Sequence, residues 1–192
     1  MIKAEAVDKT TVINILSYSF KDNQSVNYVV RNDKNSFERI KALMDYSFEL
    51  CSMFGEVWLS DDKKACALIL FPHDKRTTAK SIWLDIKLIF QAIGIFGITK
   101  TLRREAQIHK IQPKEKMAYL WFIGVEPEAQ QKGIGSKLLR QLTLRFTVLN
   151  LPLYLETSTQ KNIPWYQSFG FEIYNQINLG YSLSFLQRRP GN

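Results

Sequence analysis

Two closely spaced glycines, Gly133 and Gly135, are the first feature of this sequence that could do chemistry. They lie between an apolar run that ends at Val125 and a segment with helical periodicity. Glycine permits positive φ and lets a ligand approach the main chain, and a helix N-terminus offers unpaired N–H groups. Such a loop is typical of a site for phosphate groups. A tight strand-to-helix turn is the alternative interpretation.

The loop consists of Gln130, Gln131, Lys132, Gly133, Ile134, Gly135 and Ser136. It has neither the GxxxxGK[ST] spacing of a P-loop nor the GxGxxG spacing of a dinucleotide-binding loop. By itself the loop therefore predicts a main-chain site for an anion and does not identify the ligand.

Length and composition indicate a globular chain with one domain over residues 1–192. The 45% hydrophobic residues allow a sizeable core, and the net charge of +8 favours acidic partners. The basic residues are spread along the chain without a long block, which makes nucleic acid a less favoured partner than a small phosphate-bearing ligand. Cys51 and Cys66 lack metal-ligand spacing and are predicted to be buried thiols.

The chain shows no sign of targeting to or across a membrane. The first residues lack the apolar core of a signal peptide. The apolar segment 82–98 is interrupted by Asp85, Lys87 and Gln91, which argues against a membrane span. We therefore expect a cytoplasmic protein, with a homodimer left open.

Strands and helices alternate in a mixed order along the chain. Strands are expected at 2–7, 56–60, 64–71, 117–125, 151–157, 171–179 and 181–189. Helices are expected at 10–20, 36–54, 133–150 and from 163 to before Gly170, with a polar break at 21–27. Residues 79–110 are expected to be two helices, broken near Gly94 and Gly97, of which the first is buried or packed over a pocket. This pattern predicts an α/β or α+β fold with a strand–helix–strand unit at 117–157.

Two motifs in this order resemble the GNAT superfamily of acetyl-CoA-dependent N-acetyltransferases. The first is Val125-Glu126-Pro127 followed by the glycine loop, and the second is LYLETSTQKNIPWYQSFGF at 153–171, where Tyr166 precedes Gly170 by four residues. The resemblance implies a mixed, mostly antiparallel sheet of about seven strands with helices on both faces. It further implies a splayed central pair of parallel strands and identifies the segment 79–110 as a helical insertion.

The resemblance implies that the main-chain N–H groups from Gln131 to Ser136 bind the CoA pyrophosphate, and that Gln130 also belongs to the cofactor-binding residues. It also implies that the edge of the strand ending at Val125 pairs with the pantetheine arm. The backbone N–H groups from Ile123 to Val125 are our candidates for stabilising the oxyanion. Asn162 is either a CoA contact or the N-cap of the helix opened by Pro164.

Tyr166 matches the tyrosine that acts as general acid in many family members, and its alternative role is that of a packed aromatic side chain. Tyr119 stands where some members have a carboxylate base. Glu156 is then the candidate base, directly or through water, or else a carboxylate that orients the loop 157–162.

The predicted reaction is direct acetyl transfer from acetyl-CoA to an amine of a small molecule or peptide, without a metal. A catalytically inactive CoA-binding regulatory domain is the alternative. His73 and His109 have no partners at metal-ligand spacing, and we assign them to the surface. We assign four aromatic side chains to the core, with the lining of an acceptor pocket as the alternative: Phe37, Trp83, Phe90 and Phe96.

Overall fold

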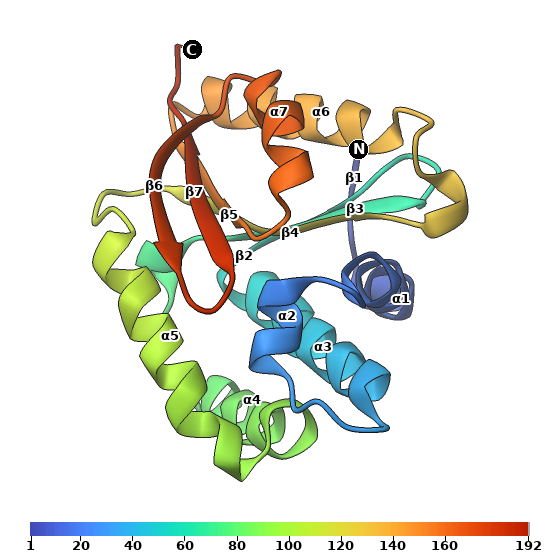
Figure 1. Ribbon diagram of the computed structural model, residues 1–192. Helices are drawn as coiled ribbons and strands as arrows, with labels where there is room; N and C mark the ends of the chain where they lie inside the picture. Colours follow the sequence, from blue (N-terminus) through green and yellow to red (C-terminus); the bar gives the residue numbers. More distant parts are fainter. Residues whose placement is uncertain (192) are drawn as a thin grey trace.

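A computed structural model describes residues 1–191 and places seven strands in one sheet (Figure 1). The sheet order is β1-β2-β3-β4-β5-β7-β6, and β4 and β5 form the parallel pair among antiparallel neighbours. The strands are β1 (Ile2–Lys3), β2 (Gly55–Leu59), β3 (Ala65–Leu70), β4 (Ala118–Val125), β5 (Leu153–Thr157), β6 (Glu172–Asn178) and β7 (Ser182–Arg188). This confirms the predicted mixed sheet with a parallel strand–helix–strand unit at its centre.

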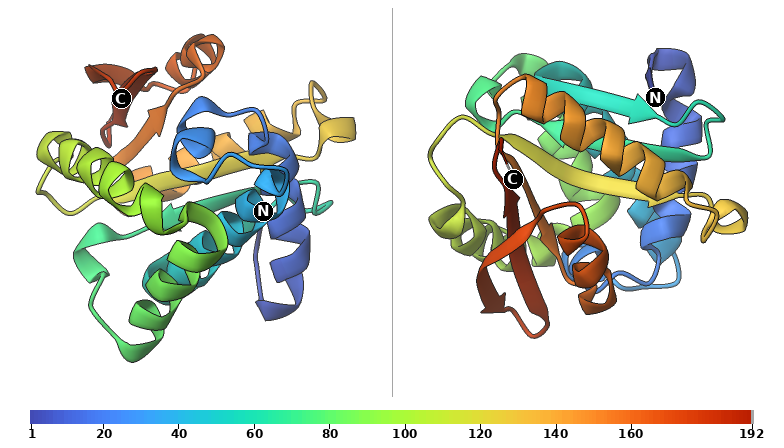
Figure 2. Two further views of the ribbon diagram at one scale, coloured as in Figure 1. Left: turned by 60° about the horizontal axis from the view of Figure 1, so that its bottom comes forward. Right: turned by 90° about the horizontal axis from the view of Figure 1, so that it is seen from above.

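Helices cover both faces of the sheet (Figures 1 and 2). One face carries α6 (Ile134–Val148) and α7 (Ile163–Gln167), which pack on it through residues such as Leu138, Leu142 and Phe146. The other side carries α1 (Lys9–Phe20), α2 (Gln24–Val29), α3 (Ser36–Phe54), α4 (Ala79–Leu88) and α5 (Ile98–Ile111). The fold is thus a sheet between two helical layers, each with its own apolar core.

The segment that we expected to be a polar break contains the short helix α2. The side chain of Asn23 accepts a hydrogen bond from the Val26 N–H at 3.0 Å and so caps this helix. Val26 and Val30 are each 4% exposed, so these two valines anchor an otherwise polar segment to the core. The expected strand at 2–7 is also shorter than predicted, because a 3₁₀ turn at Ala6–Asp8 follows β1.

The central strands β4 and β5 separate soon after they begin to pair. Their last paired residues are Leu120 and Leu155, and β4 continues to Val125 without a partner from β5. The predicted splay of the central parallel pair is therefore present. It leaves an open edge along the second half of β4.

A β-bulge at Trp121 lies where the two strands separate. Consecutive residues of β3 pair with Leu120 and Phe122, and Trp121 between them is the extra residue. A bulge shifts the alternation of side chains by one residue. Trp121 and Phe122 consequently pack on the same face, toward α1 and α3, and Ile123 returns to the face covered by α6.

Residues 79–111 form two helical arms at a sharp bend, which we call the elbow. After α4 the chain makes a π-type turn to Ile93, and Gly94 at φ +73° then redirects it toward α5. The arms bend by 101° and the predicted break near Gly94 is confirmed. Within residues 1–191, no single helix is long and apolar enough to cross a membrane; the two bent arms together pass that test by length and composition alone.

The first arm of the elbow is less buried than we expected from its sequence. Leu84 is buried against the core, but Trp83 is 63% exposed and Phe90 is 65% exposed. Phe96, in the turn between the arms, is fully exposed. The assignment of these three aromatic side chains to the core is therefore wrong, because α3 covers only one side of α4.

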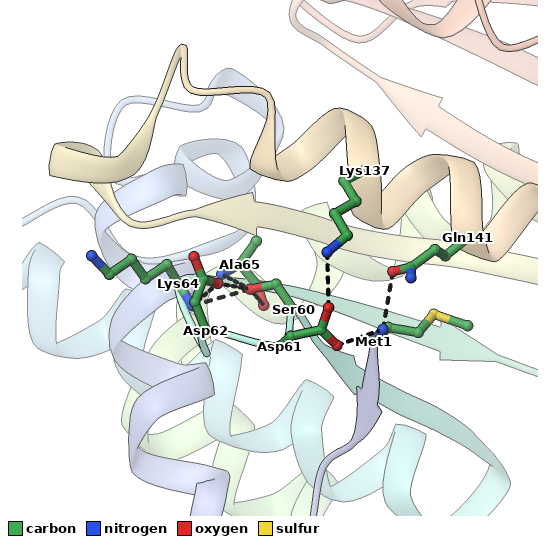
Figure 3. Close-up of polar contacts among 8 residues, drawn as sticks. All are labelled: Met1, Ser60, Asp61, Asp62, Lys64, Ala65, Lys137 and Gln141. Atoms are coloured by element: carbon green, nitrogen blue, oxygen red, sulfur yellow. Dashed lines mark hydrogen bonds and ion pairs between the residues drawn. The ribbon is translucent and has the colours of Figure 1, made fainter.

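The turn between β2 and β3 joins the first turn of α6 to the sheet (Figure 3). The Asp61 carboxylate forms two ion pairs, from Oδ1 to the Met1 amino group at 2.9 Å and from Oδ2 to Lys137 Nζ at 2.9 Å. Ser60 Oγ accepts the Ala65 N–H at 2.9 Å, which closes the turn. These contacts hold the beginning of α6, and with it the glycine loop, beside β3.

Candidate functional site

A cavity of about 650 Å³ lies where β4 and β5 separate. Its walls come from these two strands, from α2, α3 and α5, and from the segment that leads into α7. Four of the predicted site residues line it, namely Ile123, Glu156, Asn162 and Tyr166. The glycine loop and Val125 are not part of its lining and lie at the end of β4. The candidate site therefore has two parts, a cavity and an adjoining loop.

Glu156 lies in the cavity wall near the end of β5. Gln112, which follows α5, donates a hydrogen bond from Nε2 to Glu156 Oε1 at 2.9 Å. Burial raises the pKa of the Glu156 carboxyl to about 7, although the Arg104 charge, the Gln112 hydrogen bond and the Tyr119 hydroxyl act in the opposite direction. A carboxylate with this pKa exchanges a proton near neutral pH, which is what a general base requires.

Tyr119 faces this carboxylate from the neighbouring strand. It pairs in register with Tyr154, two residues before Glu156. Burial and the nearby Glu156 charge raise the pKa of the Tyr119 hydroxyl well above its usual range, so the hydroxyl stays protonated. Tyr119 of β4 and Glu156 of β5 thus form a pair of neighbouring polar groups in the cavity wall.

Arg104 connects three walls of the cavity. Its Nε donates to Tyr181 Oη at 2.9 Å, and its Nη2 donates to Ser25 Oγ at 2.6 Å. It also forms an ion pair with its neighbour Glu105. These contacts join α5 to α2 and to the end of the β6–β7 hairpin, and they place a buried positive charge near Glu156.

Tyr166 projects from α7 into the cavity and is 6% exposed. Its ring packs against Trp165 at 4.8 Å and Phe171 at 5.8 Å between centroids. No hydrogen-bond partner for its hydroxyl occurs within residues 1–191. Burial raises the pKa of the hydroxyl, so it stays protonated at neutral pH and is able to donate a proton.

The glycine loop has the backbone geometry of an anion site. Gln131 has φ +60° and Gly133 has φ +76°, and α6 begins at once with Ile134. In the part of the chain that the structure describes, the N–H groups of residues 131–136 donate to no carbonyl or side-chain oxygen. Free N–H groups at the positive end of a helix fit the phosphate groups of a nucleotide-containing ligand.

Glycine is required at both positions for different reasons. A Cβ on Gly133 would meet no atom within 4 Å, so its positive φ rather than steric crowding favours glycine there. A Cβ on Gly135 would lie 2.9 Å from Val125 Cγ2. The absence of a side chain at residue 135 thus lets α6 start close against the end of β4.

Side chains of the glycine loop form hydrogen bonds with neighbouring parts of the chain. Gln130 donates to the Val125 carbonyl oxygen at 3.2 Å, and Lys132 donates to a main-chain carbonyl in the preceding turn at 2.8 Å. Ser136 Oγ accepts the Trp165 indole N–H at 3.0 Å. These three side chains are thus bonded within the protein, whereas backbone N–H groups of the loop have no partner within residues 1–191.

The open edge of β4 presents backbone groups of Ile123 and Val125. The Glu126 N–H donates to the Lys64 carbonyl oxygen at 2.8 Å, across the antiparallel pair of β3 and β4. Alternate residues of a strand direct their backbone groups to opposite edges. Ile123 and Val125 therefore face away from β3, and Ser19 Oγ donates to the Val125 carbonyl oxygen from that side at 3.0 Å.

Asn162 does not have the capping role that we considered for it. It occupies the N-cap position of α7, but its side chain makes no capping hydrogen bond. Its side chain instead belongs to the lining of the cavity. Thr159, earlier in the same segment, accepts a hydrogen bond from Asn23 of α2 at 3.3 Å.

Several cavity residues were not predicted from the sequence. Gln112, Arg104 and Trp121 have no motif around them, and only the helical periodicity of α5 could have indicated that Leu102 and His109 share a face. His109 is exposed, as predicted for a surface histidine, and it also borders the cavity.

No group of His, Cys, Asp and Glu side chains within residues 1–191 is arranged to hold a metal ion. Cys51 and Cys66 are buried free thiols, as predicted, and burial raises the pKa of both.

Comparison with known proteins finds similarity to acetyltransferases. A family model described as "Acetyltransferase (GNAT) domain" matches residues 88–173. A Corynebacterium glutamicum protein described as "histone acetyltransferase HPA2 and related acetyltransferase" superposes with a TM-score of 0.70, at 16% identity over 100% of this chain and 96% of that chain.

Two further solved structures have the same fold. Arylalkylamine N-acetyltransferase 2 from Aedes aegypti superposes with a TM-score of 0.64, at 14% identity over 99% of this chain and 98% of its own. The C-terminal condensation domain of Ebony, solved in complex with beta-alanyl-dopamine, superposes with a TM-score of 0.65, at 7% identity over 98% of this chain and 97% of its own. The chain therefore resembles the GNAT acetyltransferase domain over residues 88–173, and its overall fold is the one that these solved structures share.

Proposed function

We propose that this enzyme transfers an acetyl group from acetyl-CoA directly to the primary amine of a small molecule that also carries an apolar or aromatic group. The observation that carries the proposal is the convergence of Glu156 and Tyr166 on one cavity at the separation of β4 and β5. The open edge of β4 and the glycine loop adjoin that cavity.

The loop and the strand edge fit the two ends of the donor. Acetyl-CoA supplies an acyl thioester at one end and a pyrophosphate at the other. The free N–H groups of residues 131–136 suit the pyrophosphate, and the backbone groups of Ile123 and Val125 suit the pantetheine amides or the thioester oxygen. Asn162 adds a polar residue to the lining of the cavity.

Glu156 and Tyr166 divide the proton transfers between them. With a pKa of about 7, Glu156 accepts the proton that the attacking ammonium group must lose, directly or through water. Tyr166, kept protonated by burial, donates a proton to the departing thiolate. Arg104 and Gln112 act on the reaction indirectly, because they lower the pKa of Glu156.

The far end of the cavity determines the class of acceptor. Tyr46 and Trp121 pack edge to face at 6.3 Å between centroids, and Leu43 and Leu88 complete this wall. An amine with an aromatic or branched apolar group would bury that group here while its nitrogen approaches Glu156. One structural neighbour is an arylalkylamine N-acetyltransferase, a name that describes acceptors of this class.

The experiment is a thiol-release assay with acetyl-CoA and a panel of amines. The panel contains phenethylamine and tryptamine, with ethanolamine and putrescine as polar comparisons. We expect the arylalkylamines to give the higher kcat/KM, and we expect Trp121→Leu to reduce that preference. Leu144→Ala, at an exposed position of α6, is the matched control and should leave the preference unchanged.

Two results would contradict the proposal. Binding of acetyl-CoA without thiol release for any amine would indicate a CoA-binding domain that does not turn over. A preference for the polar amines would retain acetyl transfer but refute the assigned acceptor class.

A further inference from the structure

The outer face of α4 exposes apolar side chains without a partner. Ile82, Trp83, Ile86 and Phe90 are between 41% and 65% exposed. Their spacing places them on one side of the helix, whereas Ser81 and Leu84 are buried on the opposite side. An exposed apolar stripe with two large aromatic residues marks an interaction surface.

The turn of the elbow extends this surface. Ile95 is 65% exposed and Phe96 is completely exposed, directly after the stripe in the chain. Figure 1 shows the elbow at the bottom of the molecule, on the opposite side from α6. We call the side chains of residues 82, 83, 86, 90, 95 and 96 the elbow patch. None of these six residues lines the cavity.

Positive charge is concentrated around the elbow patch. Residues 75–110 contain eight Lys or Arg and two Asp or Glu, whereas the whole chain contains 26 and 18. Within residues 1–191, Arg76, Arg103 and Lys110 are exposed and form no ion pair. The stretch 75–110, which includes most of the elbow and the residues just before it, therefore has a formal charge of +6, compared with +8 for the whole chain.

We propose that the elbow patch docks on an anionic lipid surface. Exposed Trp and Phe side chains flanked by Lys and Arg are the chemistry of a helix that lies in the membrane interface. A second copy of this chain fits less well, because it would bring two positively charged elbows together.

Docking in this orientation would bring the cavity near the lipid interface. Leu102 of α5 is 63% exposed and also lines the cavity, so the cavity wall reaches the surface on the elbow itself. An amphiphilic amine dissolved in the interface would then have a short path to Glu156. This consequence rests on the proposed acetyl transfer, whereas the docking itself does not.

The test is flotation of the full chain with lipid vesicles. We expect wild type to float with vesicles of phosphatidylglycerol and phosphatidylcholine, less with phosphatidylcholine alone, and less at high salt. The double variant Trp83→Gln/Phe96→Gln should lose about tenfold or more in partitioning. The control Leu144→Gln/Val148→Gln, which changes exposed apolar residues on α6, should bind like wild type.

A second variant tests the charge independently of the apolar contacts. Arg103→Gln/Lys110→Gln should weaken binding to the anionic vesicles by about tenfold and leave binding to phosphatidylcholine unchanged. Circular dichroism melting and thiol release with a soluble amine show that each variant is folded, and thiol release also separates this proposal from that of acetyl transfer.

Three outcomes would overturn the proposal. The first is no flotation of folded wild type with either kind of vesicle. The second is equal loss of binding in the α6 control. The third is a wild-type dimer in light scattering that Trp83→Gln/Phe96→Gln converts to a monomer, since a second copy would then cover the elbow patch.

Discussion

Replacement of Glu156 by glutamine should lower activity and raise stability at the same time. Glu156→Gln keeps the size of the side chain and an oxygen that accepts the Gln112 hydrogen bond, which measures 2.9 Å in the native chain. It removes the group that takes the proton from the amine. General-base catalysis typically contributes about 100-fold or more, so kcat/KM should fall by at least that factor.

The effect on stability follows from the pKa of this carboxyl. Burial raises it to about 7 from the ordinary 4.5, and a difference of about 2.5 corresponds to about 3 kcal/mol. Between these two pH values the folded chain holds the proton more tightly than the unfolded chain. The free energy of unfolding of wild type should therefore fall as the pH rises through this window, and the full cost is present above pH 7.

Glutamine does not ionise, so the variant lacks this pH dependence. Urea unfolding monitored by circular dichroism should show similar stability for both proteins below pH 4.5. Above pH 7 the variant should be more stable, by up to about 3 kcal/mol. For wild type, kcat/KM should rise with pH around an apparent pKa near 7. Full turnover of Glu156→Gln, or equal stability of the two proteins at high pH, would refute the assigned environment of Glu156.

Three further substitutions test the other parts of the site. Tyr166→Phe should lower kcat by about 10-fold or more in the thiol-release assay with an unchanged KM for acetyl-CoA, because only the proton donor is lost; wild-type kcat would exclude this role. Gln112→Leu removes a hydrogen bond that lowers the pKa of Glu156, so the rising limb of the pH–rate profile should move to higher pH, and an unmoved limb would contradict the contact. Gly133→Ala puts a Cβ at φ +76°, which should cost about 1 kcal/mol of stability in thermal unfolding and raise the KM for acetyl-CoA; an unchanged KM would argue against the loop as the donor site.

The parts of the site that local sequence determines were predictable. The positive φ of Gly133 and the start of α6 follow from a glycine loop between a strand and a helix. The entry of Tyr166 into the cavity follows from a short helix that begins at a proline and ends before Gly170. In each case residues close in sequence fix the local geometry, so a motif carries the information.

The environment of Glu156 could not be predicted in the same way. Gln112 lies 44 residues before it, and Arg104 reaches the same region from α5. Their approach depends on how the elbow folds back on the sheet, which no local pattern encodes. The same reason explains the exposed Trp83, since the apolar sequence of α4 does not tell which of its sides has a partner.

The extra residue in β4 also determines which edge of the strand the backbone amide groups after it face. Because Trp121 is unpaired, the residues after it present their amide groups to the opposite edges from those that an uninterrupted strand would give. A deletion of Trp121 would remove the bulge and make Leu120 and Phe122 consecutive partners of Ile69 and Leu68, so that Ile123 and Val125 would still face the gap beside β5. The bulge therefore adds the aromatic side chain of Trp121 to the cavity wall while the pairing with β3 keeps the backbone edges of Ile123 and Val125 in place.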